Sequence, residues 1–199
     1  MKGVFIVIEG LDGAGISTQA SLLAEFLRKK GKKVILTKEP TNSILGGLAK
    51  SVLINEWKAS PKTLQLIFCA DRSNHLDIEI EPALSKGYWV VCDRYMFSSL
   101  AYGYASNLNS KWLRYINLRF RLPDLCIFLD VKPDTAMSRS SNQDSSLHLF
   151  DQRQKLELVR QSYIKIAREF HLKTVDGNGS IEETAAKTDK LIEKAFFRQ

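Results

Sequence analysis

Residues 4–18 read VFIVIEGLDGAGIST, and this stretch decides the fold. A strand-sized apolar run, VFIVI at 4–8, leads into a glycine-rich loop, and the residues after the loop follow a helical pattern. Small residues in this context let the backbone wrap a phosphate, because successive amide N–H groups and the helix N-terminus point at the anion. The stretch therefore predicts a phosphate-binding loop, in preference to a merely structural glycine turn, with the Ser17 hydroxyl available to Mg²⁺.

The predicted phosphate loop lacks one residue that such loops normally present. The pattern G-x-x-x-x-G-K-[ST] has a lysine before the hydroxyl residue, whereas this chain has Ile16. Phosphoryl transfer depends mainly on positioning and on stabilisation of charge, so the loss of one cation affects the rate more than the binding. By analogy with the removal of one transition-state donor, the cost is about 3 to 4 kcal/mol unless another cation substitutes.

The composition bounds the class of protein. The chain has 199 residues, 44% of them hydrophobic and 26% charged, which is enough for one buried core and ordinary for a globular protein. We therefore expect a single domain over residues 1–199. The apolar runs are no longer than a strand, the first run ends at Glu9 with no cleavage pattern, and the 3 cysteines are odd in number. These features predict a cytoplasmic protein with no membrane partner.

The net charge of +7 suggests nucleic acid as a partner, since a basic surface attracts phosphate. The densest basic run, RKKGKK at 28–33, falls at the expected end of a helix, where cations complement the helix dipole. A solvated helix end explains this run better, so we expect no nucleic acid partner. A small anionic substrate also benefits from a positive field.

The remaining chain alternates strand-like runs with helical periodicity, which predicts an α/β fold with a five-stranded parallel sheet between two layers of helices. The active site is expected at the carboxyl ends of the strands, where neighbouring crossovers diverge to opposite faces. A polar segment at about 138–150, which begins SRSSNQDSSLH, is either a flap over that site or a plain surface loop. The expected strands are 4–9, 33–37, 88–93, 125–130 and 172–175, and the expected helices are 17–30, 44–56, 61–84, 97–106, 109–119, 133–139, 152–169 and 180–197.

Four further segments agree with the loop: TKEP at 37–40, FCADRSNH at 68–75, DRYMFSSLAY at 93–102 and VRQSY at 159–163. With them the chain resembles the thymidylate kinase family of P-loop nucleoside monophosphate kinases, from Gly10 nearly to the end. The DRY segment, with its downstream serine and Ala-Tyr, is far more selective than the loop. The resemblance implies the three-layer P-loop kinase fold, transfer of the γ-phosphoryl of ATP to dTMP with Mg²⁺ in dTTP synthesis, and a homodimer.

The resemblance also implies roles for particular residues. Phe68 stacks on the thymine ring and Arg72 bonds its carbonyl edge, which fits the four-residue spacing that puts both on one helical face. Tyr102 lies against the sugar and excludes a ribose 2′-hydroxyl. The residues implied to bind dTMP are Asp12, Lys38, Glu39, Phe68, Arg72, Arg94, Ser98, Ser99 and Tyr102, and those implied to bind ATP are Gly10, Leu11, Asp12, Gly13, Ala14, Gly15, Ile16, Ser17 and Thr18.

The catalytic assignments rest on charge. Asp93 ends a strand at the carboxyl edge of the sheet, where its carboxylate and the Ser17 hydroxyl suit hydrated Mg²⁺. Arg94 can grip the acceptor phosphate through its planar fork. The family pattern also supplies an arginine from the flap, and the nearest ones here are Arg139 at its base and Arg153 just beyond it. These four residues, Asp93, Arg94, Arg139 and Arg153, are the predicted catalytic groups.

The chain departs from the family pattern at further positions. Lys38 replaces the arginine expected before Glu-Pro, which keeps the charge but loses the bidentate fork, and Gly103 replaces a common glutamine. Two hypotheses remain open: an active thymidylate kinase in which another basic group, such as Arg139, Arg153 or Arg160, replaces the loop lysine, or a catalytically weak nucleotide-binding protein that regulates a partner. The acceptor residues favour the enzyme, because a bare phosphate-binding module has no need of them.

Overall fold

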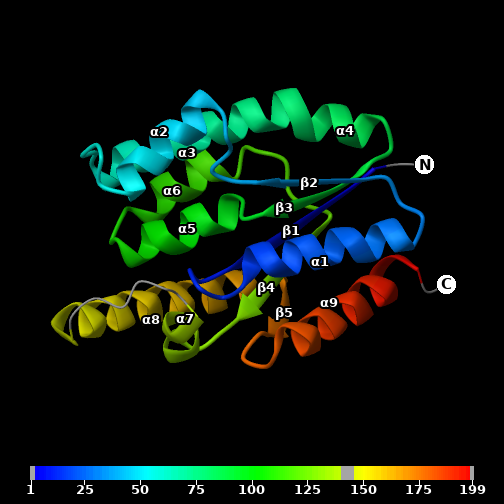
Figure 1. Cartoon of the computed structure of the whole chain (residues 1–199). Coiled ribbons are helices and arrows are strands. Elements are labelled where there is room, and N and C mark those ends of the chain that lie inside the picture. The colour runs from blue at the N-terminus through cyan, green and yellow to red at the C-terminus, as the bar shows by residue number, and fades with distance from the viewer. Residues whose placement is uncertain (1–2, 140–145, 198–199) are drawn as a thin grey trace.

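A computed structural model describes residues 3–139 and 146–197, without the side chains of residues 146–150. Five parallel strands form one sheet in the order β2-β3-β1-β4-β5 (Figure 1). The α/β class and the five-stranded parallel sheet predicted from the sequence are confirmed. The strands are β1 Val4–Gly10, β2 Val34–Lys38, β3 Trp89–Asp93, β4 Leu125–Asp130 and β5 Lys173–Asp176.

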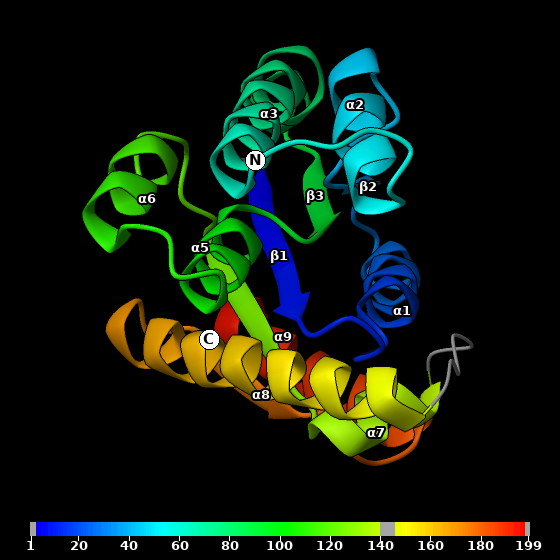
Figure 2. The same cartoon turned by 90° about the vertical axis from the view of Figure 1, so that its left-hand side faces the viewer.

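Helices cover both faces of this sheet, as Figure 2 shows along its edge. Helices α1 and α9 pack together on one face, and α5 and α8 pack together on the other. None of the described helices is long and apolar enough to cross a bilayer. The helical elements are α1 Ile16–Lys29, α2 Ile44–Leu53, α3 Pro61–His75, a π-helical turn η1 Leu76–Ile80, α4 Glu81–Ser85, α5 Met96–Ala105, α6 Ser110–Asn117, α7 Pro133–Arg139, α8 Ser146–Glu169 and α9 Ile181–Phe196.

Strand β1 lies at the centre of the core. The side chains of Phe5, Ile6, Val7 and Ile8 are fully buried, because a central parallel strand is covered by helices on both faces. This explains why VFIVI is a continuous apolar run with no alternation. The same strand ends at Gly10 and so delivers the phosphate loop to the carboxyl edge of the sheet.

Two expected helices differ from the structure. The helix expected at 61–84 is interrupted by the π-turn η1 before α4, beside Pro82, which has no N–H to donate to the carbonyl of Ile78. Helix α8 begins at Ser146 rather than at 152, and residues 138 and 139 belong to α7. The expected flap at 138–150 is therefore partly helical at both ends, while its residues 140–145 lie outside the described part of the chain.

The strand order positions the site. From β1 the chain passes through α1 and crosses over β3 to form β2 at one edge of the sheet. From β3 it runs in the opposite direction and crosses over β1 to form β4. The two crossovers diverge between β1 and β3, which are neighbours, and a crevice opens at such a switch point in parallel sheets. The carboxyl ends of β1 and β3 carry the phosphate loop and Asp93, respectively.

Candidate active site

The phosphate loop turns sharply between β1 and α1. Gly13 and Gly15 have φ values of 79° and 85°, in the left-handed region that glycine tolerates best. A Cβ at Gly13 would lie only 2.2 Å from the carbonyl oxygen of Ala136 on α7, so no larger residue fits there. Gly15 caps α1 and supplies no side chain to its first N–H groups. These groups face a cavity of about 430 Å³ that the loop lines, which suits an anion.

Ser17 and Asp93 meet at the floor of this cavity. The Ser17 hydroxyl donates to Oδ2 of Asp93 at 2.5 Å, although the two residues come from α1 and β3. Both offer oxygen ligands, which Mg²⁺ prefers, and Mg²⁺ usually takes its other ligands from water and nucleotide phosphates. Within residues 3–139 and 146–197, no group of three or more His, Cys, Asp or Glu side chains is placed to hold a metal. The donor set therefore fits an ion that enters with its nucleotide.

Ile16, at the position of the missing lysine, is only 4% exposed and packs in the hydrophobic core. The structure also places the arginines that were predicted to replace that lysine. Arg139 donates to the carbonyl oxygens of Gly177 and Gly179 at 2.9 and 2.8 Å. Arg153 pairs with Asp134 at 2.6 Å, and Arg160 pairs with Asp130 at 2.7 Å. All three guanidinium groups thus have partners within the protein.

Lys155 is a basic residue that the sequence analysis did not single out. It projects from α8 and lines two adjoining cavities, each of which it shares with Asp12 and Tyr102. No acidic side chain among the described residues forms an ion pair with it. The sequence signal that could have identified Lys155 was its helical spacing, since it precedes the buried Leu156 by one residue and the buried Val159 by four.

Arg94 joins the phosphate loop to a second, larger cavity. Its backbone has a φ of 67°, a strained conformation for a residue with a Cβ. The guanidinium donates to the Gly10 carbonyl at 2.9 Å and to Oδ1 of Asp12 at 2.7 Å. Burial by itself lowers the pKa of Arg94, but interactions with Tyr102, Asp12 and other groups raise it above its usual value, so the cation is retained.

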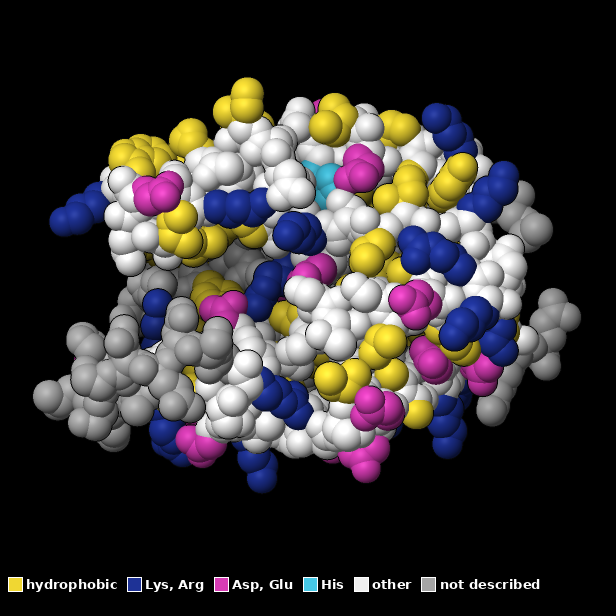
Figure 3. All heavy atoms as spheres, in the orientation of Figure 1, with side chains coloured by type: hydrophobic (Ala, Val, Ile, Leu, Met, Phe, Trp, Pro, Cys, Tyr) yellow, Lys and Arg dark blue, Asp and Glu magenta, His cyan; other side chains and the backbone are white. Residues whose placement is uncertain are grey.

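The second cavity has a volume of about 500 Å³ and brings together most of the residues predicted to bind dTMP. Figure 3 shows this side of the molecule hollowed between α2 and α3 above and α8 below. The Tyr102 hydroxyl accepts from the Asp12 amide at 3.1 Å, which ties the cavity wall to the phosphate loop. Lys38 lies apart, on a neighbouring cavity with Ser17 and Asp93. The predicted residues that line the large cavity are Asp12, Glu39, Phe68, Arg72, Arg94, Ser98, Ser99 and Tyr102.

Arg72 forms the buried end of this cavity and is 1% exposed. Its Nε donates to Glu39 at 2.9 Å, Nη1 donates to Asn117 at 2.6 Å and Nη2 donates to Ser99 at 3.0 Å. Burial by itself lowers the pKa of Arg72, but Glu39 raises it above the usual value. The guanidinium is therefore a fixed cation, since Glu39, Ser99 and Asn117 hold it, and each terminal nitrogen keeps one further N–H.

Glu9 and His75 are buried polar residues that the sequence analysis left without a role. Glu9 accepts from the backbone amides of Tyr95 and Ser98 at 3.0 and 3.1 Å and from the Tyr163 hydroxyl at 2.9 Å. Burial raises the pKa of its carboxyl.

His75 continues the helical face of Phe68 and Arg72, and this helical spacing was the sequence signal that could have identified it. Asn117 gave no such signal, because only the tertiary structure brings α6 to Arg72.

Comparison with known proteins agrees with this geometry. The family model for thymidylate kinase matches residues 8–188, which is most of the chain. The chain belongs to the thymidylate kinase family. A probable thymidylate kinase of Pyrococcus horikoshii is 43% identical over 199 residues, which cover 96% of this chain and 97% of the relative. A thymidylate kinase of Carboxydothermus hydrogenoformans is 35% identical, with 92% of this chain and 93% of the relative covered.

Proposed function

We propose that this thymidylate kinase family member transfers the γ-phosphoryl of ATP to dTMP, giving dTDP and ADP. The observation that carries the proposal is the meeting of two cavities at Asp12 and Arg94. One is lined by the phosphate loop and the other by an aromatic ring and a fixed guanidinium. A donor phosphate and an acceptor phosphate can thus approach each other beside the same cation. The family comparisons give no support to the alternative of a catalytically weak regulator.

On the donor side, the backbone of residues 10–18 would hold the ATP phosphates through its amide groups. Ser17 and Asp93 would hold Mg²⁺, which supplies neutralisation of the developing charge on the phosphates. Arg94 would stabilise the transferred group and the acceptor phosphate together, because it lies where the two cavities meet. This use of fixed cations requires no reorganisation at the moment of transfer.

On the acceptor side, Phe68 would stack on the thymine ring while Arg72 donates to its carbonyl edge. Ser98 and Ser99 would present polar groups to the base, and Tyr102 would lie against the sugar. Glu39 would act by holding Arg72, as its contact with Nε supports. Lys38 would act on phosphate rather than on the base, since it shares a cavity with Ser17 and Asp93.

The charge that the loop lysine normally supplies needs another source. Arg139 and Arg153 remain the hypotheses from sequence, although each would have to leave its present partner. Lys155 is a third candidate, because it lines the acceptor cavity beside Asp12 without an ion-pair partner in the described chain. A single domain over 1–199, a flap at 138–150 and a cytoplasmic location likewise remain predictions.

A homodimer is also part of the proposal. Large apolar side chains are exposed on α2, α3 and η1, among them Ile44 at 89%, Leu66 at 52% and Ile78 at 66%. A surface of this kind favours association with another protein surface. Size-exclusion chromatography with light scattering would give twice the chain mass of 22.6 kDa for a dimer.

A coupled assay of ADP formation, with ATP, Mg²⁺ and each nucleoside monophosphate in turn, tests the activity. We expect dTMP to be the preferred acceptor and activity to require Mg²⁺. Asp93→Asn, which keeps the shape but removes the charge at the metal position, should abolish most of it. Equal turnover of purine monophosphates and dTMP would contradict the acceptor assignment, and no ADP formation with any acceptor would contradict the enzyme.

A further inference from the structure

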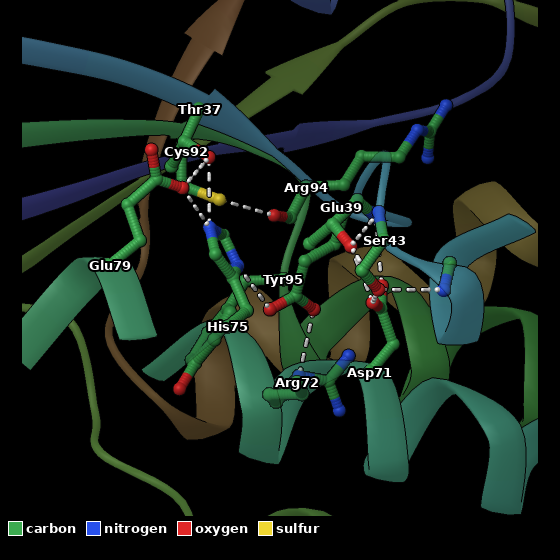
Figure 4. A network of polar contacts seen from close by, with 12 residues as sticks. Thr37, Glu39, Ser43, Asp71, Arg72, His75, Glu79, Cys92, Arg94 and Tyr95 are labelled. Carbon is green, nitrogen blue, oxygen red and sulfur yellow. Dashed lines mark hydrogen bonds and ion pairs between the residues drawn. The ribbon is translucent and has the colours of Figure 1, made fainter. Parts of the chain in front are cut away.

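His75 lies behind the acceptor cavity, at the last residue of α3, with only 1% of its surface exposed. Its two ring nitrogens point in opposite directions (Figure 4). Nδ1 lies 3.1 Å from Oε1 of Glu39. Nε2 lies 2.8 Å from the Thr37 hydroxyl and 3.0 Å from Oε2 of Glu79. Both ring nitrogens therefore face oxygen atoms.

The hydrogen bonds around the ring determine its protonation. The Thr37 hydroxyl has one proton and lies 2.7 Å from Oε2 of Glu79 and 2.8 Å from Nε2, so when it donates to the carboxylate it accepts from Nε2. The other oxygen of Glu39 accepts from Arg72 at 2.9 Å, and the carboxylate of this ion pair can only accept from Nδ1. A neutral imidazole has one donor nitrogen, whereas this arrangement uses two. With the Thr37 proton on Glu79, the geometry favours an imidazolium.

We propose that His75 is a buried imidazolium that positions Glu39 and, through Glu39, the guanidinium of Arg72 that reads the base. His75 is a positioning residue, since Glu39 and Arg72 separate it from the cavity. The inference rests on the proposed function, because reading of the base by Arg72 is part of that function. It identifies a second buried cation that determines acceptor affinity.

The Glu39 carboxylate links the two cations, one at each oxygen. If His75 loses its charge, Oε1 loses a charge-assisted hydrogen bond and the carboxylate is free to turn about its terminal torsion. Arg72 then keeps Asn117 and Ser99 but loses the fixed partner of its Nε. The N–H groups that remain for the base are less well aimed, so affinity for dTMP falls before the transfer step is affected.

The surroundings of the ring favour the charged form. Burial by itself lowers the pKa of His75, but hydrogen bonds and charge interactions with Glu39 and Glu79 raise it above its usual value. The other titratable groups labelled in Figure 4 are Asp71, Arg72, Cys92, Arg94 and Tyr95. Burial raises the pKa of the Cys92 thiol and of the Tyr95 phenol, so both are neutral near pH 7. Of the two arginines, Arg94 pairs with Asp12, whereas Arg72 pairs with Glu39, which lies between it and the ring.

The protonation is measured on the wild-type protein by nitrogen-15 NMR of the histidine rings, with the His75 signal assigned through His75→Gln. At pH 6.5, where an unperturbed histidine is about half protonated, both His75 nitrogens should show imidazolium shifts. His171 is exposed and serves as the internal reference. A neutral His75 at this pH would overturn the inference, whatever the enzyme assays give.

The positioning role is measured by kinetics. His75→Gln keeps one side-chain donor but removes the charge, and should raise KM for dTMP about tenfold, since a charge-assisted bond is lost, with kcat changed less than about threefold. His171→Asn is the matched control, because it removes an exposed histidine at a φ of 55°, which asparagine tolerates. An unchanged KM in a folded His75→Gln protein would overturn the inference.

The pH profile separates a charge effect from a packing effect. The KM of the wild-type protein for dTMP should rise with pH as His75 deprotonates. Dividing this KM by the KM of His75→Gln at the same pH cancels the contribution from titration of dTMP itself. Glu79→Gln, at a side chain that is 42% exposed, removes one group that raises the His75 pKa and should shift this rise to lower pH. Identical profiles for wild type and His75→Gln would overturn the inference. If wild type does not phosphorylate dTMP, the proposed function fails, while the NMR result still decides the protonation.

Discussion

The donor loop and the acceptor cavity use different means to hold an anion or a base. The loop at residues 10–18 offers backbone amides and a helix N-terminus, and its side chain at the lysine position, Ile16, is in the core. The acceptor cavity offers side-chain cations, Arg72 and Arg94, each fixed by buried or partly buried partners. Substitution of one side chain in the loop leaves the backbone amides in place. Substitution of one charged side chain in the cavity leaves its partners without a hydrogen bond.

The difference predicts where substitutions have large effects. Removal of one partner from a buried ion pair costs about 3 to 5 kcal/mol, because the other charge is left without compensation. Replacement of one apolar side chain by another of similar volume costs less than about 1.5 kcal/mol. The donor loop has Ile16 where the G-x-x-x-x-G-K-[ST] pattern has lysine, and its cavity still lies at the N-terminus of α1. The charged residues predicted to contact the thymine base and the acceptor phosphate, Glu39, Arg72 and Arg94, all line the larger cavity.

The largest effect is expected at the junction of the two regions. Arg94→Ala should lower kcat/KM for dTMP by roughly 10³-fold, because the cation shared by both cavities is lost. Alanine keeps a Cβ, so the strain of the backbone at a φ of 67° is unchanged. Steady-state kinetics in the coupled assay measures the effect, with the exposed Arg119→Ala as the control. A fall in kcat/KM of less than tenfold would contradict a role of Arg94 in both the donor loop and the acceptor cavity.

Restoring the loop charge should have the next largest effect. Ile16→Lys should raise kcat by up to about 10²-fold with KM for dTMP nearly unchanged, because the added cation acts on the donor phosphates. Ile16→Met is the matched control, since it conserves volume without charge. The same assay should identify the present substitute, and we expect Lys155→Ala to lower kcat more than Arg139→Ala or Arg153→Ala. A flat kcat across the whole series would show that charge at the loop does not limit transfer.

Within the acceptor region, Arg72→Ala should weaken selection of the thymine base by about 2 kcal/mol, or roughly 30-fold, because a charge-assisted hydrogen bond is lost. The ratio of kcat/KM for dTMP to that for dCMP measures it. Lys62→Ala, at an exposed position in the first turn of the same helix, should leave the ratio unchanged. Retention of full selectivity by a folded Arg72→Ala protein would contradict the assignment of the base-reading residue.

The smallest effect is expected outside both regions, on α9. Burial and the nearby Glu193 raise the pKa of Asp189 to about 6. This value lies above that of the unfolded chain, about 3.9, so the unfolded chain gives up the Asp189 proton first as pH rises. The free energy of unfolding therefore falls between pH 4 and pH 6 and stays lower above pH 6. Asp189→Asn should therefore raise Tm at pH 7 by a few degrees at most, since the group is half exposed. The difference should vanish near pH 4, and kcat should not change.

The sequence predicted most of the fold because the relevant signals are local. The run VFIVI, the glycines of the loop and the helical spacing of Phe68 and Arg72 each lie within a few neighbouring residues. Periodicity could not place η1, since that turn depends on the missing N–H of Pro82. It also missed the early start of α8, whose first residues, SLHLF, directly follow a polar stretch. The helical spacing of Phe68 and Arg72 also includes His75, but spacing alone does not show which residues His75 contacts.

By itself, then, the sequence determined the parallel sheet and the tight turn of the glycine-rich loop, and it predicted the residues around the acceptor, because strand propensity, turn geometry and helical period act over short distances. Only the tertiary structure decided that Glu39 links Arg72 to His75, that Asn117 from α6 completes the set, and that Arg139, Arg153 and Arg160 have partners elsewhere. These contacts join residues up to 45 positions apart. Their partners are fixed by packing of the helices on the sheet, and no local pattern encodes that packing.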